Sequence, residues 1–143
     1  MKKIALLGST GSIGTQVLKV VDRYPNKFKI VSLCCNNNAK LLQEQAQKYK
    51  PEVIGLTNSE KTNEISSLPN GTTLYTGEHA LLHCVLEQAD IVVVAVVGFC
   101  GLESVIQACK MGKLIALANK ESLVAGGPLV TELAKKHGAT IIP

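Results

Sequence analysis

Short apolar runs alternate along this chain with segments in which apolar residues recur every three to four positions. The runs predict strands, since most are rich in β-branched residues. They cover Ile4–Leu7, Phe28–Cys34, Glu52–Leu56, Asp90–Val97, Leu114–Ala118 and Ala139–Ile142. The first intervening segment predicts a helix with an apolar stripe at i, i+4, i+7 and i+8, formed by Ile13, Val17, Val20 and Val21. Later helices are expected over residues 39–49, around Leu81, Cys84, Val85 and Gln88, and over residues 102–111 and 127–137.

This alternation predicts one doubly wound α/β domain over residues 1–143. Strands that read as continuous apolar runs are typical of a mostly parallel sheet covered by helices on both faces. A helix between consecutive strands gives the right-handed crossovers of such a sheet. Residues 57–77 break the rhythm, and within them Thr73–Tyr75 is expected as an additional edge strand.

Composition and charge exclude several classes of partner. The chain has 143 residues with a net charge of +4, carried by scattered lysines and a single arginine, and it contains only three tyrosines and two phenylalanines. Nucleic-acid-binding proteins concentrate basic charge or place aromatic residues for stacking, so no nucleic-acid partner is expected. The longest apolar run, residues 91–102, is too short to cross a bilayer, so no membrane association is expected either.

The cysteines point to a reducing compartment. There are five of them, without C-x-x-C spacing: Cys34, Cys35, Cys84, Cys100 and Cys109. Cysteines in this pattern are typically small apolar core residues of a cytoplasmic protein. Cys34 and Cys35 are adjacent on a predicted strand, so their side chains should point to opposite faces of the sheet.

Three glycines at intervals of three, Gly8, Gly11 and Gly14, join the first strand to the first helix. A loop in this place can bind a phosphate through the unpaired N–H groups and positive dipole of the helix N-terminus. Gly8 would permit the turn, Gly11 the approach of a pyrophosphate, and Gly14 the packing of helix on strand. Ser9, Thr10 and Ser12 would add hydroxyl groups. The context predicts a Rossmann-like dinucleotide-binding domain; the alternative is a tight turn without a ligand.

The end of the second strand favours NADP(H) over NAD(H). An acidic residue there would accept hydrogen bonds from the ribose 2′-hydroxyl of NAD. The segment instead reads SLCCNNNAK, and Asn36, Asn37, Asn38 and Lys40 offer amide donors and a cation suited to a 2′-phosphate. The alternative is that three asparagines form a polar turn with left-handed backbone geometry.

A second polar cluster, Asn119, Lys120 and Glu121, follows the strand Leu114–Ala118 on the same carboxyl edge of the sheet. Ligands of open α/β sheets bind along this edge, so the cluster could contact a nicotinamide ribose and a substrate. The alternative is helix capping by Asn119, with Glu121 facing the helix dipole. His79, His83 and Glu87 have a spacing that can hold zinc on one helix face, but a solvated face is the preferred interpretation, and no metal site is expected.

The motifs GSTGSIG at 8–14, AVVGFCGL at 95–102, LANKESLVAGG at 117–127 and the terminal TIIP resemble the 1-deoxy-D-xylulose 5-phosphate reductoisomerase family. The resemblance covers the whole chain in the same order. It implies an NADPH-dependent oxidoreductase and isomerase of isoprenoid precursor biosynthesis, which converts 1-deoxy-D-xylulose 5-phosphate, a phosphorylated sugar, to 2-C-methyl-D-erythritol 4-phosphate. The pairing of the glycine loop with the ANKE stretch makes the resemblance specific.

The resemblance also implies roles for individual residues. Lys120 would contact the substrate, and the residues that would bind NADPH are Thr10, Gly11, Ser12, Ile13, Asn36, Asn37, Asn38, Asn119 and Glu121. The family's Mg²⁺ or Mn²⁺ ligands, catalytic lid and C-terminal helical domain would lie outside these 143 residues. The chain is therefore expected to be the cofactor domain of a homodimeric enzyme, without catalytic residues and inactive alone. Alternatives are another NADP-dependent dehydrogenase domain and a non-catalytic module that senses a nucleotide or coenzyme A.

Overall fold

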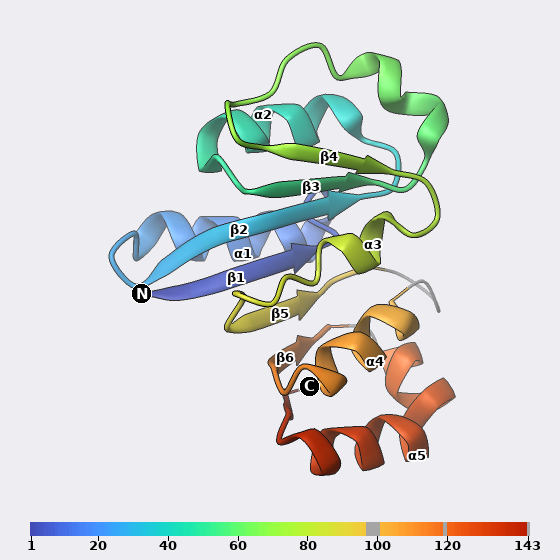
Figure 1. Ribbon diagram of the computed structural model, residues 1–143. Coiled ribbons are helices and arrows are strands. Elements are labelled where there is room, and N and C mark those ends of the chain that lie inside the picture. The colour runs from blue at the N-terminus through green and yellow to red at the C-terminus, as the bar shows by residue number, and fades with distance from the viewer. Residues whose placement is uncertain (97–100, 119, 143) are drawn as a thin grey trace.

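The computed structural model describes residues 1–96, 101–118 and 120–142, with the side chains of residues 120–125 outside the description. Seven parallel strands form one sheet in the order β4-β3-β2-β1-β5-β6-β7. They are β1 (Lys2–Leu7), β2 (Phe28–Cys35), β3 (Val53–Leu56), β4 (Thr73–Thr76), β5 (Ile91–Val94), β6 (Leu114–Leu117) and β7 (Thr140–Ile142). Figure 1 shows the strands running in one direction, so their carboxyl ends share one edge.

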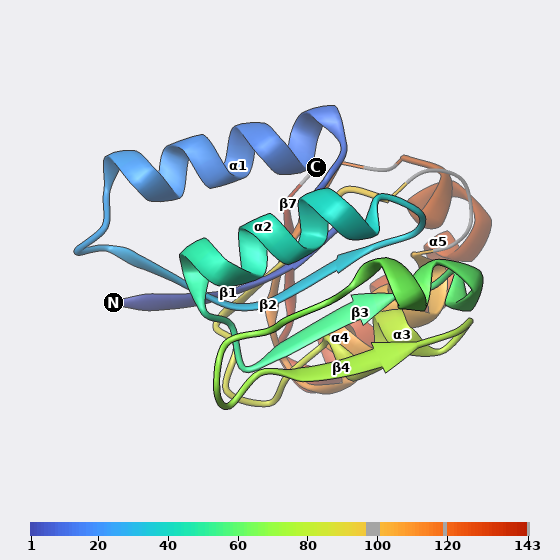
Figure 2. The ribbon, with the colours of Figure 1, turned by 90° about the horizontal axis from the view of Figure 1, so that it is seen from above.

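Helices cover the two faces of the sheet in separate groups (Figure 2). The helices α1 (Ser12–Arg23) and α2 (Ala39–Tyr49) lie on one face, and the 3₁₀ helix η1 (Ser59–Glu64) contacts α2 and β3. The helices α3 (Ala80–His83), α4 (Leu102–Lys110) and α5 (Lys120–His137) lie on the other. The strand order reverses between β1 and β5, which makes their carboxyl ends the switch point where doubly wound sheets bind ligands.

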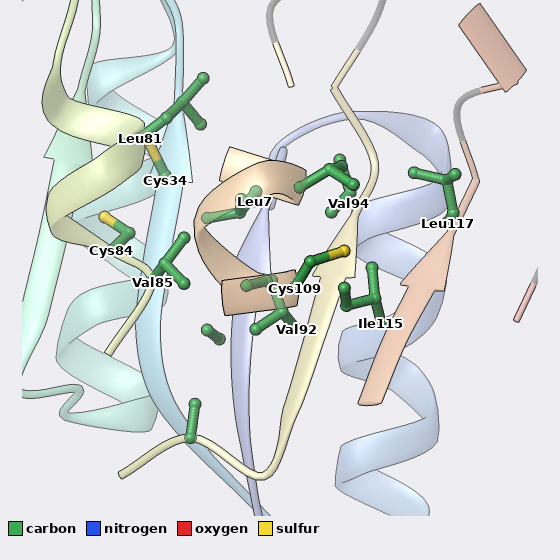
Figure 3. Packing of buried hydrophobic residues seen from close by; sticks show 14 of the residues in the cluster. Leu7, Cys34, Leu81, Cys84, Val85, Val92, Val94, Cys109, Ile115 and Leu117 are labelled. Carbon is green, nitrogen blue, oxygen red and sulfur yellow. The ribbon is translucent and has the colours of Figure 1, made fainter. Parts of the chain in front are cut away.

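The sheet separates two apolar clusters. Figure 3 shows the cluster under α3 and α4, where Cys34, Cys84 and Val92 are fully buried. The neighbouring residue Cys35 belongs to the cluster under α1 and α2. The prediction that Cys34 and Cys35 face opposite sides of the sheet is therefore confirmed, because adjacent side chains alternate across a strand.

The doubly wound α/β fold is confirmed, and every predicted strand is present with boundaries shifted by a few residues. Thr73–Tyr75 forms the predicted edge strand as part of β4. The strand expected at Asp90–Val97 is shorter, since β5 covers Ile91–Val94 and Val97 lies outside the described residues. Among the helices that the structure describes, none has the length and apolar composition that a membrane span requires.

The predicted apolar face of the first helix is partly wrong. Ile13 and Val20 are 44% and 49% exposed, whereas Gly14, Leu18 and Val21 are buried. The helix is rotated because Gly14 must lie against the turn after β1, and this contact selects the face that meets the sheet. The sequence offers two apolar stripes on this helix, and periodicity alone does not choose between them.

Two further helix predictions need correction. The helix expected around Leu81–Gln88 is a single turn, α3, after which the chain continues in turns to β5. The helix expected over 127–137 begins seven residues earlier, at Lys120, and is interrupted at Gly126, where φ and ψ are −113° and 17°. The Gly-Gly-Pro sequence at 126–128 is typical of a helix start, but the structure uses it as a kink between two helical segments.

Candidate functional site

The turn between β1 and α1 is held against two neighbouring strands. The backbone N–H groups of Gly8 and Ser9 both donate to the carbonyl oxygen of Cys34, at 2.8 and 2.9 Å. Gly8 has a φ of 93°, and a Cβ atom there would lie 2.5 Å from the carbonyl oxygen of Ala95, which follows β5. A Cβ atom on Gly14 would lie 2.0 Å from the carbonyl oxygen of Gly8. These two positions therefore exclude any side chain.

Gly11 differs from both of these glycines. Among the described residues, a Cβ atom there would have only the carbonyl oxygen of Gly8 within 4 Å, at 3.8 Å. Gly11 is also the N-cap of α1, with a φ of −79°, a value open to any residue. Within the described chain no side chain caps this end of α1, and its first turn holds no acidic residue. The first N–H groups of the helix and the positive end of its dipole thus face an open space, which is the arrangement that binds anions.

Helix α2 supports the turn from behind. Gln45 is buried, and its Nε2 donates to the carbonyl oxygen of Ser9 at 2.9 Å. The Ser9 side chain is itself completely buried. The expectation that the Ser9 hydroxyl would serve a ligand is therefore wrong, because the bonds from the N–H groups of Gly8 and Ser9 to Cys34 hold the turn with the Ser9 side chain buried in the protein. Thr10 is half-buried and Ser12 is exposed.

A cleft of about 520 Å³ opens at the switch point, along the carboxyl ends of β1, β2, β3 and β5. Its lining is mostly small or apolar: Gly8, Thr10, Gly11, Cys35, Asn36, Thr57, Glu78, Leu81, Ala95 and Val96. Burial raises the pKa of the Cys35 thiol to about 12, so this side chain is neutral at physiological pH. Cys35 donates a weak hydrogen bond to the carbonyl oxygen of Asn38 at 3.6 Å and does not supply a nucleophilic thiolate.

The three asparagines follow β2 at the rim of this cleft, and all three are exposed. Asn36 lines the cleft, and its Oδ1 accepts a hydrogen bond from the Thr57 hydroxyl at 2.5 Å. Asn38 is the N-cap of α2, with its Oδ1 accepting from the N–H of Leu41 at 3.2 Å. The left-handed geometry that the alternative allowed for this turn is not adopted, since Lys50 is the one non-glycine residue with a positive φ among the described residues. Hydrogen bonds to the β3–η1 loop hold the asparagines in ordinary backbone geometry instead.

The structure therefore brings together part of the predicted cofactor site. Thr10, Gly11 and Asn36 line one cleft, and Ser12 and Ile13 form the first turn of α1 beside it. Asn119 lies outside the described residues, as do the side chains of Lys120 and Glu121, although α5 begins at Lys120.

The predicted histidine arrangement is not present. His79 precedes α3 and His83 ends it, so Glu87 lies beyond the helix and not on its face. His83 stacks on Tyr75 with ring centroids 4.1 Å apart. In the part of the chain that the structure describes, no group of three His, Cys, Asp or Glu side chains is placed to hold a metal ion.

Sequence reasoning missed several residues of the cleft, chiefly Thr57, Glu78 and Leu81, together with the supporting Gln45 and Asn58. Thr57 and Asn58 follow β3, on the carboxyl edge that the argument for Asn119–Glu121 already used, so the same rule could have found them. Gln45 is a polar residue on the buried side of α2, and its role depends on a contact 36 positions away.

A parallel sheet that reverses its order beside a glycine turn and an uncapped helix N-terminus defines the class of Rossmann-like dinucleotide-binding domains. Comparison with known proteins identifies the family within this class. The sequence profile of 1-deoxy-D-xylulose 5-phosphate reductoisomerase matches residues 4–127, and the chain belongs to this family.

Individual relatives agree with this assignment. The 1-deoxy-D-xylulose 5-phosphate reductoisomerase of Rippkaea orientalis is 43% identical over 148 residues, which cover 100% of this chain and 37% of that protein. A crystal structure of DOX-P reductoisomerase in complex with NADPH, fosmidomycin and magnesium has a TM-score of 0.91 and 37% identity, covering 100% of this chain and 36% of that one. The Zymomonas mobilis enzyme in complex with NADPH has a TM-score of 0.91 and 29% identity, covering 99% and 38%. The chain thus spans little more than a third of the length of these relatives.

Proposed function

We propose that residues 1–143 form the NADPH-binding domain of a 1-deoxy-D-xylulose 5-phosphate reductoisomerase. The observation that carries the proposal is the uncapped N-terminus of α1 opening onto the cleft at Gly11. The pyrophosphate would lie against the first turn of α1, at Thr10, Gly11, Ser12 and Ile13. The adenosine half would extend along the cleft toward Asn36, Asn37 and Asn38.

The described residues fit this cofactor. The cleft is open where a side chain on Gly11 would otherwise stand, and the first turn of α1 carries no acidic residue that would repel a pyrophosphate. Three amides and Lys40 follow β2, where a carboxylate would favour NAD. Bound here, NADPH would supply a hydride, while the chain's own residues would hold the pyrophosphate and orient the adenosine.

The activity of the whole protein is part of the proposal. We assign it the conversion of 1-deoxy-D-xylulose 5-phosphate to 2-C-methyl-D-erythritol 4-phosphate, with Lys120 contacting the phosphorylated substrate and Asn119 and Glu121 contacting NADPH. The Mg²⁺ or Mn²⁺ ligands would come from residues beyond these 143, and the enzyme would be a homodimer. A cytoplasmic location agrees with the free thiols of Cys34, Cys35, Cys84 and Cys109.

Replacing Gly11 by leucine tests the proposed cofactor site. Any residue can adopt the backbone φ of −79° at this position, and the nearest described atom to the Cβ position is the carbonyl oxygen of Gly8, at 3.8 Å. The leucine side chain can therefore be accommodated, and it would fill the cleft at the helix N-terminus. We expect Gly11→Leu to retain the far-UV circular dichroism of the wild type and to weaken NADPH binding by about 100-fold or more, since the side chain keeps the anion away from the backbone donors. Isothermal titration calorimetry gives both affinities.

The same titration separates the alternatives when NADH and coenzyme A are included. The proposal requires the wild-type chain to bind NADPH more tightly than either of these. Preference for coenzyme A would favour a non-catalytic sensing module. NADPH affinity that is equal in the wild type and Gly11→Leu would contradict binding at this loop.

A further inference from the structure

The loop after β3 makes two side-chain hydrogen bonds with the asparagines after β2. The hydroxyl of Thr57 donates to Oδ1 of Asn36, and Nδ2 of Asn58 donates to Oδ1 of Asn37 at 2.8 Å. The backbones of the two loops are also joined, since the N–H of Asn58 donates to the carbonyl oxygen of Asn36 at 3.0 Å. The two loops are therefore one hydrogen-bonded unit at the rim of the cleft.

A backbone group determines which way the Asn37 amide points. The N–H of Glu60, which can only donate, bonds to Oδ1 of Asn58 at 3.1 Å. The other end of the Asn58 amide, Nδ2, must then be the end that meets Asn37. Because an amino group donates, Asn37 must offer its oxygen to Asn58, and its own Nδ2 is left for another acceptor.

The same accounting fixes the amide of Asn38, whose partner is also a backbone N–H group, whereas Asn36 meets a hydroxyl that donates to its oxygen. Oδ1 of Asn36 is taken by Thr57 and Oδ1 of Asn38 by the N–H of Leu41. Each of the three side-chain oxygens thus accepts a hydrogen bond, and among the described residues no acceptor is paired with the three amino groups, which keep their N–H donors. A group of donors suits a phosphate, which mainly accepts hydrogen bonds, whereas a ribose hydroxyl can also donate and gains more from a site that offers an acceptor.

We propose that Asn58 and Thr57 are positioning residues that hold the amides of Asn37 and Asn36 with their N–H donors toward the ligand, and that this orientation sets the preference for a 2′-phosphate. This inference rests on the proposed function, since it assumes that the adenosine of NADPH lies along this rim. Asn58 itself does not need to touch the cofactor.

The substitution Asn58→Asp tests the orientation. The carboxylate would still accept from the N–H of Glu60 and cap η1, so the loop should fold. It could not donate to Asn37, whose amide would turn its amino group toward the carboxylate and its oxygen toward the ligand. We expect the dissociation constant for NADPH to rise about tenfold or more and that for NADH to change less than about threefold. A purely structural defect would weaken both cofactors alike.

A double-mutant cycle with Asn37→Ala separates orientation from the added charge. If Asn58 acts through Asn37, Asn58→Asp should have little further effect on NADPH binding in the Asn37→Ala background. An undiminished effect in that background would overturn the inference.

Asn26→Asp is a matched control for net charge, since Asn26 lies before β2, more than about 20 Å along the strand from Asn37. It should leave both affinities unchanged.

Thr57→Val provides a second variant that is close to isosteric. It removes the donor to Asn36 without adding charge, and we expect a smaller loss of NADPH preference, about threefold. Retention of the wild-type preference by both Asn58→Asp and Thr57→Val would overturn the inference while leaving the proposed function intact. A wild-type chain that does not prefer NADPH to NADH would instead overturn the proposed function, and the inference with it.

Discussion

Gly8, Gly11 and Gly14 occupy one loop, but each meets different neighbours. Gly8 and Gly14 lie against backbone carbonyl oxygens of Ala95 and Gly8, at distances that a Cβ atom cannot tolerate. Gly11 has room for a side chain and lines the cleft. Two of the glycines are thus required for packing, and the third keeps the cleft open for a ligand.

This difference predicts that alanine lowers the free energy of unfolding strongly at Gly14 and only slightly at Gly11. In Gly14→Ala the new Cβ would meet the Gly8 oxygen at 2.0 Å, and because both partners are backbone, the helix must move. We expect the free energy of unfolding to fall by about 3 kcal/mol or more. Gly11→Ala should change it by no more than about 1 kcal/mol. Urea denaturation followed by circular dichroism measures both, and equal stability of the two variants would contradict the assignment.

At the scale of the elements, two buried serine hydroxyl groups differ in whether a hydrogen bond joins a helix to the sheet through them. Ser32 on β2 is fully buried, and its Oγ donates to the carbonyl oxygen of Cys84 at 2.5 Å, where the chain leaves α3. Ser104 on α4 is equally buried, but its Oγ has no hydrogen-bond partner among the described residues. The first hydroxyl therefore joins β2 to the end of α3, whereas the described part of the chain offers no partner to the second.

The two serines therefore form a matched pair for mutation. Ser32→Ala would leave the buried carbonyl group of Cys84 without a donor, and we expect the free energy of unfolding to fall by about 1–3 kcal/mol. Ser104→Ala removes a buried hydroxyl that has no partner in the described part of the chain and favours the helix, so stability should be unchanged or rise by up to about 1 kcal/mol. Thermal and urea unfolding give the two values. A loss in Ser104→Ala as large as that in Ser32→Ala would refute this distinction.

In the molecule as a whole, the cleft depends on segments from both halves of the sheet. Gly11 follows β1, Thr57 follows β3 and Ala95 follows β5. These strands are brought into one sheet only when the chain has folded, so a ligand of the cleft binds the folded state and not the unfolded chain. Ligand binding should consequently be coupled to the stability of the entire domain.

We predict that NADPH stabilises the 143-residue chain without being oxidised by it. At a free concentration about 100 times its dissociation constant, NADPH should raise the free energy of unfolding by about 2.7 kcal/mol. The chain matches 37% of the length of its Rippkaea orientalis relative, and its described residues hold no cluster suited to a metal ion. Addition of 1-deoxy-D-xylulose 5-phosphate and Mg²⁺ should therefore leave the NADPH absorbance constant. Substrate-dependent oxidation by this chain would show that the catalytic groups are present.

Local patterns in the chain were enough to predict the alternation of strands and helices, the parallel sheet and the glycine turn. These patterns are the continuous apolar runs, the spacing of Gly8, Gly11 and Gly14, and the absence of an acidic residue after β2. Folding itself selected the buried face of α1, turned Ser9 inward and ended α3 after one turn. It also placed Asn58 against Asn37, 21 positions away. The buried face of α1 depends on a backbone contact between Gly14 and Gly8 that apolar periodicity does not reveal, and the other three outcomes depend on contacts between segments distant in sequence.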